Sequence, residues 1–191
     1  MERLFDEKSK DFCEVLYQDP ELCKRVIQLL AGDEIGDFEI DTKWGSKLHD
    51  YPYGAHIYVP CKDCNGQEYD VRIMTANELS AHFKKNYFDE MHREMYYYLP
   101  DPDSPKSIVI IICNYDIARD EKIRHASQRV CQKAPSNTLY NAVEIYISAT
   151  PETACEESPL GNLVDYLING VPIDDITKRF HDGLIRLKSS K

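Results

Sequence analysis

The side chains with the greatest potential for chemistry lie in a predicted β-hairpin that spans residues 54–77. Apolar and polar residues alternate on either side of Asn65-Gly66, and this dipeptide is the commonest signal for a two-residue hairpin turn. Because successive side chains of a strand point to opposite faces, Asp70 and Arg72 share one face and are expected to form an ion pair. The imidazole of His56 could serve in acid–base or nucleophilic chemistry, but no nucleophile and orienting group are visible beside it in the sequence.

Helices are expected on the N-terminal side of the hairpin. Asp19 can cap a helix whose first position is Pro20, apolar residues recur after it at helical spacing, and Gly32 is a typical stop. Another helical stretch precedes Asp19. Residues 37–44 have the pattern of a first strand, and residues 49–53 are expected to form a loop before the hairpin.

The sequence after the hairpin alternates between helical and strand patterns. Residues 78–99 carry apolar side chains every four positions, which predicts a helix, and the proline-rich run that follows ends it. Residues 107–114 form a continuous apolar run, typical of a strand buried on both faces in an α/β sheet. A further strand at 141–149 and two helices at 160–169 and 173–187 complete the expected α/β fold.

Five segments in a shared order resemble the transposase-like branch of the PD-(D/E)XK nucleases, the recombination-promoting nuclease group. The hairpin reads AHIYVPCKDCNGQEYDVRIMTAN where members commonly read like LDVYxKDxxGxxYNIEMQTTN. The other segments are VLYQDPELCKRVIQLLAG, KSIVIIICNYDIA, QRVC and NLVDYLING, so the resemblance covers nearly the whole chain. It implies a restriction-endonuclease-like core of order αβββαβ with an additional C-terminal strand and helices, and metal-dependent DNA cleavage as the activity of the family.

The resemblance also locates the family's catalytic positions, and this chain departs from the family at all of them. The strand acid falls on His56, the glutamate of the ExQ motif falls on Arg72, and its glutamine falls on Met74. Mg²⁺ prefers oxygen ligands in octahedral geometry, which neither His56 nor Met74 supplies, and Arg72 places a cation at the metal position. We therefore predict a catalytically inactive pseudonuclease that has no metal cofactor and keeps a binding or regulatory role.

A second interpretation keeps the activity and moves the metal site. Asp70 lies on the same strand face as Arg72, and Glu14 on the first helix might approach it, so these two acids are the candidate surviving ligands. In this alternative the protein is an active Mg²⁺-dependent DNA endonuclease that uses relocated acidic residues. The family often has Asn or Asp at the position of Asp70, so this aspartate does not by itself indicate a relocated ligand.

Length and composition are compatible with both interpretations. The 191 residues are about one domain, 1–191, and no apolar run approaches the roughly 20 residues that cross a bilayer, so no membrane partner is expected. The charged N-terminal stretch lacks the apolar segment of a signal peptide and favours a location in the cytoplasm.

The chain has seven cysteines, an odd number, which favours free thiols over disulfides. Cys61 and Cys64 form a CxxC that we interpret as two free cysteines on a loop, because a structural zinc site generally needs four ligands.

The charge of the chain bears on nucleic-acid binding. The formal net charge is −10, whereas affinity for the phosphate backbone depends largely on Lys and Arg. A local run of basic residues provides the candidate DNA contacts: Arg119, Lys122, Arg124, Arg129 and Lys133. Such a run is more often a solvated face, and an intact nuclease relative or a second copy of this chain is the other expected partner.

Overall fold

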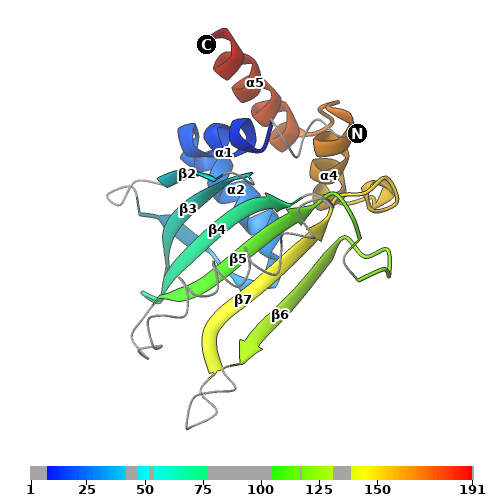
Figure 1. The fold of residues 1–191 in the computed structure, drawn as a ribbon. Coiled ribbons are helices and arrows are strands. Elements are labelled where there is room, and N and C mark those ends of the chain that lie inside the picture. The colour runs from blue at the N-terminus through cyan, green and yellow to red at the C-terminus, as the bar shows by residue number, and fades with distance from the viewer. Residues whose placement is uncertain are drawn as a thin grey trace.

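The computed structural model describes residues 8–41, 47–51, 54–76, 105–116, 118–130 and 139–190. Within these ranges the fold is α/β, as predicted, and its helices pack on a seven-stranded mixed sheet (Figure 1). The helix predicted at 78–99 lies outside the described residues.

Two consecutive helices, α1 (Lys8–Gln18) and α2 (Pro20–Ala31), open the described chain. Asp19 separates them and caps α2, since its carboxylate accepts a backbone N–H of the first turn at 3.0 Å. Pro20 stands at the first helical position, where a missing N–H is not needed. Gly32 ends α2 with a φ of 58°, a backbone conformation that residues with a side chain rarely adopt. The predicted start and stop of this helix are confirmed.

The strands follow the order β1-β3-β4-β5-β7-β6, and β2 pairs with the same edge of β3 as β1 does. β3 and β4 form the antiparallel hairpin, β4, β5 and β7 run parallel, and β6 is antiparallel to β7. The predicted hairpin, the apolar strand after it and the later alternating strand are therefore confirmed. The strands are β1 (Phe38–Ile40), β2 (Lys47–Tyr51), β3 (Gly54–Asp63), β4 (Glu68–Ala76), β5 (Lys106–Cys113), β6 (Arg124–Val130) and β7 (Leu139–Ser148).

Two strands differ from the sequence prediction. β2 forms where a loop is expected, and β6 lies within the run considered only as a basic patch. Among the described strands, β2 pairs only with β3 and β6 only with β7. Edge strands of this kind are held by backbone hydrogen bonds to one neighbour, so their sequences need not show a buried apolar face.

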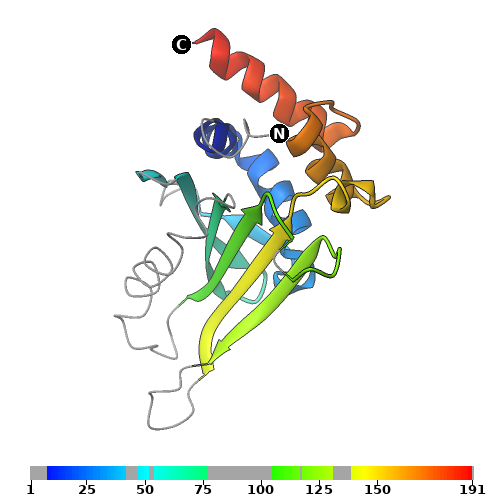
Figure 2. The ribbon, with the colours of Figure 1, turned by 45° about the vertical axis from the view of Figure 1, so that its right-hand side comes forward.

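The chain ends with two helices near their predicted positions, α4 (Pro159–Asn169) and α5 (Asp175–Ser189). The Ser158 hydroxyl caps α4 by accepting a backbone N–H at 2.9 Å, and Asp174 caps α5 in a reciprocal capping box with Thr177. Figure 2 shows α5 beyond one end of the sheet, together with α1 and α4. No helix in the described part of the chain is long and apolar enough to cross a membrane.

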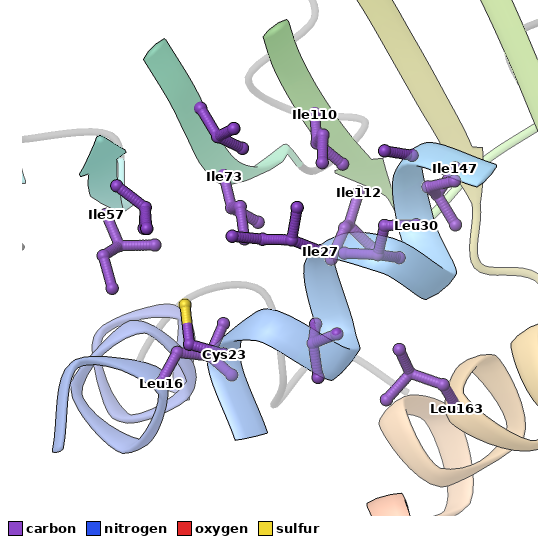
Figure 3. Close-up of a cluster of buried hydrophobic side chains, with 14 of the residues drawn as sticks. Leu16, Cys23, Ile27, Leu30, Ile57, Ile73, Ile110, Ile112, Ile147 and Leu163 are labelled. Carbon is purple, nitrogen blue, oxygen red and sulfur yellow. The ribbon is translucent and has the colours of Figure 1, made fainter. Parts of the chain in front are cut away.

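One face of the sheet, which we call the helix face, packs against α1, α2 and α4 and forms the main core (Figure 3). Its central side chains are at most 1% exposed. Burying each such side chain contributes about 1.5–3 kcal/mol to folding. The labelled members are Leu16, Cys23, Ile27, Leu30, Ile57, Ile73, Ile110, Ile112, Ile147 and Leu163.

Contacts from α5 hold it against α1 and against the start of α2. Arg179 donates from Nε and Nη2 to the carboxylate of Asp19, each at 2.6 Å. Burial acts to raise the pKa of Asp19, but the hydrogen bonds from Arg179 and from the first turn of α2 outweigh it and hold that pKa below its ordinary value. A Cβ at Gly183 would lie 2.7 Å from Val15 Cγ1, so the close approach of α5 to α1 requires glycine there.

Candidate functional site

The hairpin that carries the predicted site is closed by a tight turn between β3 and β4. Gly66 has a φ of 85°, as the turn requires. The carboxylate of Asp63 accepts the backbone N–H groups of Asn65 and Gln67, each at 2.9 Å. These contacts fix the register of the two strands and therefore the positions of the side chains along them.

The register brings the predicted site residues together on the face of the sheet opposite the helix face, which we call the hairpin face. His56 pairs with Met74, Tyr58 with Arg72, and Pro60 with Asp70. Paired residues of neighbouring strands project on the same face. His56, Asp70, Arg72 and Met74 thus share the hairpin face, and His56 lies opposite Met74, at the other end of this row from Asp70.

Arg72 and Asp70 are connected through Tyr58 rather than by the direct ion pair that the sequence suggested. The guanidinium carbon of Arg72 lies 5.7 Å from the centroid of the Tyr58 ring, within the range of a cation–π interaction. The Tyr58 hydroxyl is hydrogen-bonded to Asp70. Tyr58 stands diagonal to Asp70 across the strands, where a long aromatic side chain can still reach it.

The electrostatics of this cluster follow from its partial burial. Burial raises the pKa of Asp70 above its ordinary value, and the hydrogen bond from Tyr58 and the charge of Arg72 offset only part of that rise. Burial together with Asp70 also raises the pKa of the Tyr58 hydroxyl. The Nε of Arg72 is buried and has no hydrogen-bond partner among the described residues. The cluster therefore holds a partly buried acid bound by Tyr58 and an arginine outside any ion pair in the described part of the chain.

The hairpin face continues across β5 and β7 to an acid that the sequence analysis missed. Arg72 pairs with Val109 and Val109 with Glu144, so these three residues form one row across the sheet. Glu144 is only 3% exposed and accepts a hydrogen bond from the Tyr146 hydroxyl at 3.0 Å. The alternation of residues 141–149 could have identified this residue. It places Glu144 on the face of the strand that does not carry the apolar side chains.

The residues of the hairpin face do not fit a divalent metal. In the described side chains, this face holds no set of three carboxylate, imidazole or thiolate groups close enough to share an ion. Glu14 lies half-buried on α1, whose buried residues pack on the helix face, and it does not join Asp70 in such a set. The chemistry of the donors agrees, because Arg72 and Met74 offer no oxygen ligand to Mg²⁺.

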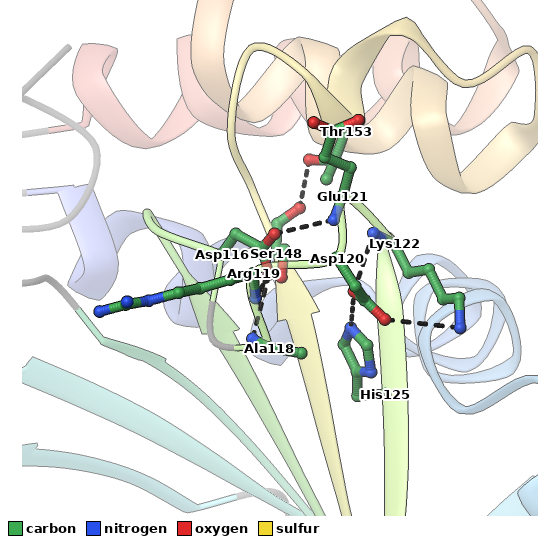
Figure 4. Close-up of polar contacts among 9 residues, drawn as sticks. All are labelled: Asp116, Ala118, Arg119, Asp120, Glu121, Lys122, His125, Ser148 and Thr153. Carbon is green, nitrogen blue, oxygen red and sulfur yellow. Dashed lines mark hydrogen bonds and ion pairs between the residues drawn. The ribbon is translucent and has the colours of Figure 1, made fainter.

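A different set of potential metal ligands occurs in the loop between β5 and β6 (Figure 4). Single ligand atoms of Asp116, Asp120 and His125 lie within 4.8 Å of one another. Asp116 accepts the backbone N–H groups of Arg119 and Glu121, each at 2.9 Å, and Asp120 lies 3.0 Å from His125 Nε2. The carboxylates thus hold the loop in shape, including its two residues with positive φ, Arg119 at 58° and Glu121 at 60°.

The predicted basic run is distributed over different environments. Arg119 is exposed in the loop, and Lys122 lies 3.4 Å from the carboxylate of Asp120. Arg124 opens β6 and its guanidinium packs on Gly32, where an added Cβ would meet Nη1. Arg129 lies further along β6, and Lys133 is outside the described residues.

The two cysteines of the CxxC lie in different environments. Cys61 is 3% exposed and belongs to β3, not to a loop as predicted, whereas Cys64 is exposed in the turn. Burial raises the pKa of the Cys61 thiol. Both cysteines are free thiols, as expected, and neither belongs to a set of metal ligands among the described residues.

The hairpin face combines three kinds of polar group. It presents a cation stacked on an aromatic ring, an acid bound by that tyrosine and a buried glutamate further along the same face. The guanidinium can donate hydrogen bonds to a polar or anionic group. No family model, no curated protein and no solved structure matches this chain.

Proposed function

We propose that the protein is a PD-(D/E)XK nuclease-like protein that has lost hydrolysis and binds nucleic acid without cleaving it. The proposed restriction-endonuclease-like core is supported by the order of elements: helices, an antiparallel hairpin, and β5 parallel to its second strand. In this proposal the chain forms a single domain, and the protein is located in the cytoplasm.

The observation that carries the proposal is the environment of Arg72. This arginine takes the place that the resemblance gives to a metal-binding glutamate, and it lies over Tyr58 instead of pairing with an acid in the described structure. A fixed cation repels Mg²⁺: at about 4 Å and an effective dielectric constant near 20, each unit of charge is worth roughly 4 kcal/mol. The same guanidinium can donate to a phosphate oxygen, which is the preferred role of arginine at phosphates.

Nucleic acid is the favoured partner because the cluster offers two kinds of contact to it. A guanidinium donates to phosphate oxygens, and an exposed part of a tyrosine ring can stack on a base. Arg119 in the neighbouring loop and the basic side chains of β6 are further candidate contacts to phosphate. An intact nuclease relative or a second copy of this chain is the competing partner.

Cleavage of plasmid DNA in Mg²⁺ or Mn²⁺ tests the loss of hydrolysis. We expect no nicking by the natural chain and expect that the triple variant His56→Asp, Arg72→Glu, Met74→Gln restores some. Cleavage by the natural chain that disappears in Asp70→Ala would support the relocated-acid endonuclease and overturn the proposal.

Binding is tested separately, by fluorescence anisotropy with a labelled single-stranded oligonucleotide over a range of salt concentrations. We expect affinity to fall as salt rises, and Arg72→Met to weaken binding by about ten-fold or more, since a charged hydrogen bond contributes about 1.5–3 kcal/mol. Lys62→Met is the matched control, because Lys62 is an exposed lysine on the same hairpin that pairs with Glu68. An affinity that is the same at all salt concentrations would exclude a phosphate-dominated mode.

A further inference from the structure

A pocket of about 150 Å³ lies between α1, α4 and α5, at the helical end of the molecule and away from the hairpin face. Its floor is apolar and buried, since Phe12, Leu167 and Phe180 are each at most 2% exposed. Ile185 is 52% exposed and borders the pocket at the surface. A volume of this size matches a cavity that accepts one benzene ring, so the pocket suits a ligand built on a single ring.

Aromatic rings form the walls of the pocket. The ring centroids of Phe12 and Phe180 are 5.1 Å apart, and Tyr166 meets Phe180 edge to face at 5.8 Å and 67°. Tyr166 also meets the His181 ring edge to face, at 6.0 Å and 85°. Flat aromatic molecules pack well against rings in tilted and edge-to-face arrangements. The walls therefore favour an aromatic ligand over a branched aliphatic one.

The polar side chains of the pocket supply hydrogen-bond donors. Tyr166 Oη lies 3.2 Å from His181 Nδ1. Burial, with a contribution from Asp182, raises the pKa of Tyr166 to about 12, so the hydroxyl keeps its proton and can donate it to Nδ1. A neutral His181 then carries its proton on Nε2 as a donor.

Lys188 adds a positive charge to the lining of the pocket. No acid in the described part of the chain lies within ion-pair distance of its ammonium group. Asp11 of α1 also lines the pocket, and its side chain is already engaged in another interaction. Lys188 can therefore pair with an anionic group of a ligand.

We propose that this pocket binds a small aromatic monocarboxylate, with its ring against the aromatic lining and its carboxylate at Lys188. The ring replaces water on an apolar surface, and the carboxylate accepts hydrogen bonds from the ammonium group and the imidazole. Aliphatic carboxylates lack the ring, and benzylamine, which is protonated at neutral pH, would place a cation beside Lys188. This site is independent of the proposed function of the hairpin face.

Isothermal titration calorimetry with benzoate on the full chain tests the proposal. We expect benzoate to bind in the millimolar range or tighter, benzyl alcohol to bind more weakly, and acetate and benzylamine to give no binding heat. Lys188→Met should weaken benzoate binding about five-fold, the equivalent of about 1 kcal/mol, and leave benzyl alcohol unaffected. Lys178→Met on the same helix, at an exposed lysine outside the pocket, should change neither affinity.

Filling the pocket provides the second arm of the test. Leu184→Phe adds volume to the lining and should abolish benzoate binding, and Ile185→Trp should do the same from the rim if the first variant does not fold by circular dichroism. Absence of benzoate binding to the natural chain would overturn the proposal. So would tighter binding of benzylamine than of benzoate, or undiminished benzoate binding in a folded pocket-filled variant.

Discussion

The two faces of the sheet differ in the polarity of their side chains. On the helix face, side chains such as Ile73 and Ile110 are fully buried in a continuous apolar core. On the hairpin face, Arg72 is adjacent to Ile73 in β4 but stacks on a tyrosine, and a buried glutamate stands in the same row. Alternation along one strand therefore places the main apolar core on one face and the polar residues of the candidate site on the other. The hairpin face also holds a second, smaller buried apolar cluster of Met74, Val109, Ile111 and Cys113.

This comparison shows why a functional site can change without loss of the fold. Apolar burial on the helix face provides most of the stabilisation, and it does not depend on which polar groups occupy the other face. A change of charge at position 72 alters the hairpin face but leaves the packing of Ile57, Ile73 and Ile110 in place. The fold can therefore persist when the polar groups of the hairpin face change.

The largest expected effect comes from breaking the helix face. Ile73→Ala removes a fully buried side chain and should lower the free energy of unfolding by about 2–5 kcal/mol. Urea denaturation followed by circular dichroism measures it. A loss below about 1 kcal/mol would mean that this face is not the main source of stability.

A smaller effect is expected from Asp19→Ala, which disturbs the helical layer behind that face. The variant loses the cap of α2 and the bidentate contact with Arg179, and should lose about 1–2 kcal/mol. The folded pKa of Asp19 is depressed, so this stabilisation is present above the unfolded pKa near 3.9 and disappears as the pH falls through the folded value. Denaturation at a series of pH values should show the variant and the natural chain converging in acid.

The edge strands mark the limit of what the sequence could predict. The helices, the hairpin, β5 and β7 have apolar patterns or caps that are visible in the sequence, because burial and capping determine those elements. β2 and β6 are polar strands stabilised by pairing with one neighbour, and pairing partners are not encoded locally. The pair of site residues Asp70 and Arg72 was placed on the right face, but the intervening Tyr58 depends on a diagonal contact across strands. Glu144 joins the site only through the order β4-β5-β7.

On the hairpin face, Arg72→Met should change stability by about 1 kcal/mol or less, because a cation–π contact that is only partly buried is worth about 0.5–1 kcal/mol and methionine fills similar space. The same substitution removes the charge that lowers the pKa of Asp70, so that pKa should rise further. Thermal denaturation and carboxyl-carbon NMR measure the two effects. A destabilisation comparable to that of Ile73→Ala would contradict the view that the helix face contributes more to stability than Arg72 does.

The smallest effect is expected from Asp70→Asn. The folded pKa of Asp70 is raised, so the stability that this group contributes is complete below the unfolded pKa near 3.9 and is lost as the pH rises through the folded value. The asparagine variant lacks this loss and should gain stability relative to the natural chain on going from acid to neutral pH. Parallel pH series of the two proteins check the sign, and a relative gain in acid would contradict it.

The central claim is that charge at Arg72 excludes a divalent ion from the hairpin face. Calorimetric titration with Mn²⁺ tests it most directly, in a background carrying Asp120→Asn so that the loop acids do not contribute. We predict no binding to this protein, and binding once His56→Asp, Arg72→Glu and Met74→Gln are added. Binding of Mn²⁺ without those changes, abolished by Asp70→Ala, would contradict the account.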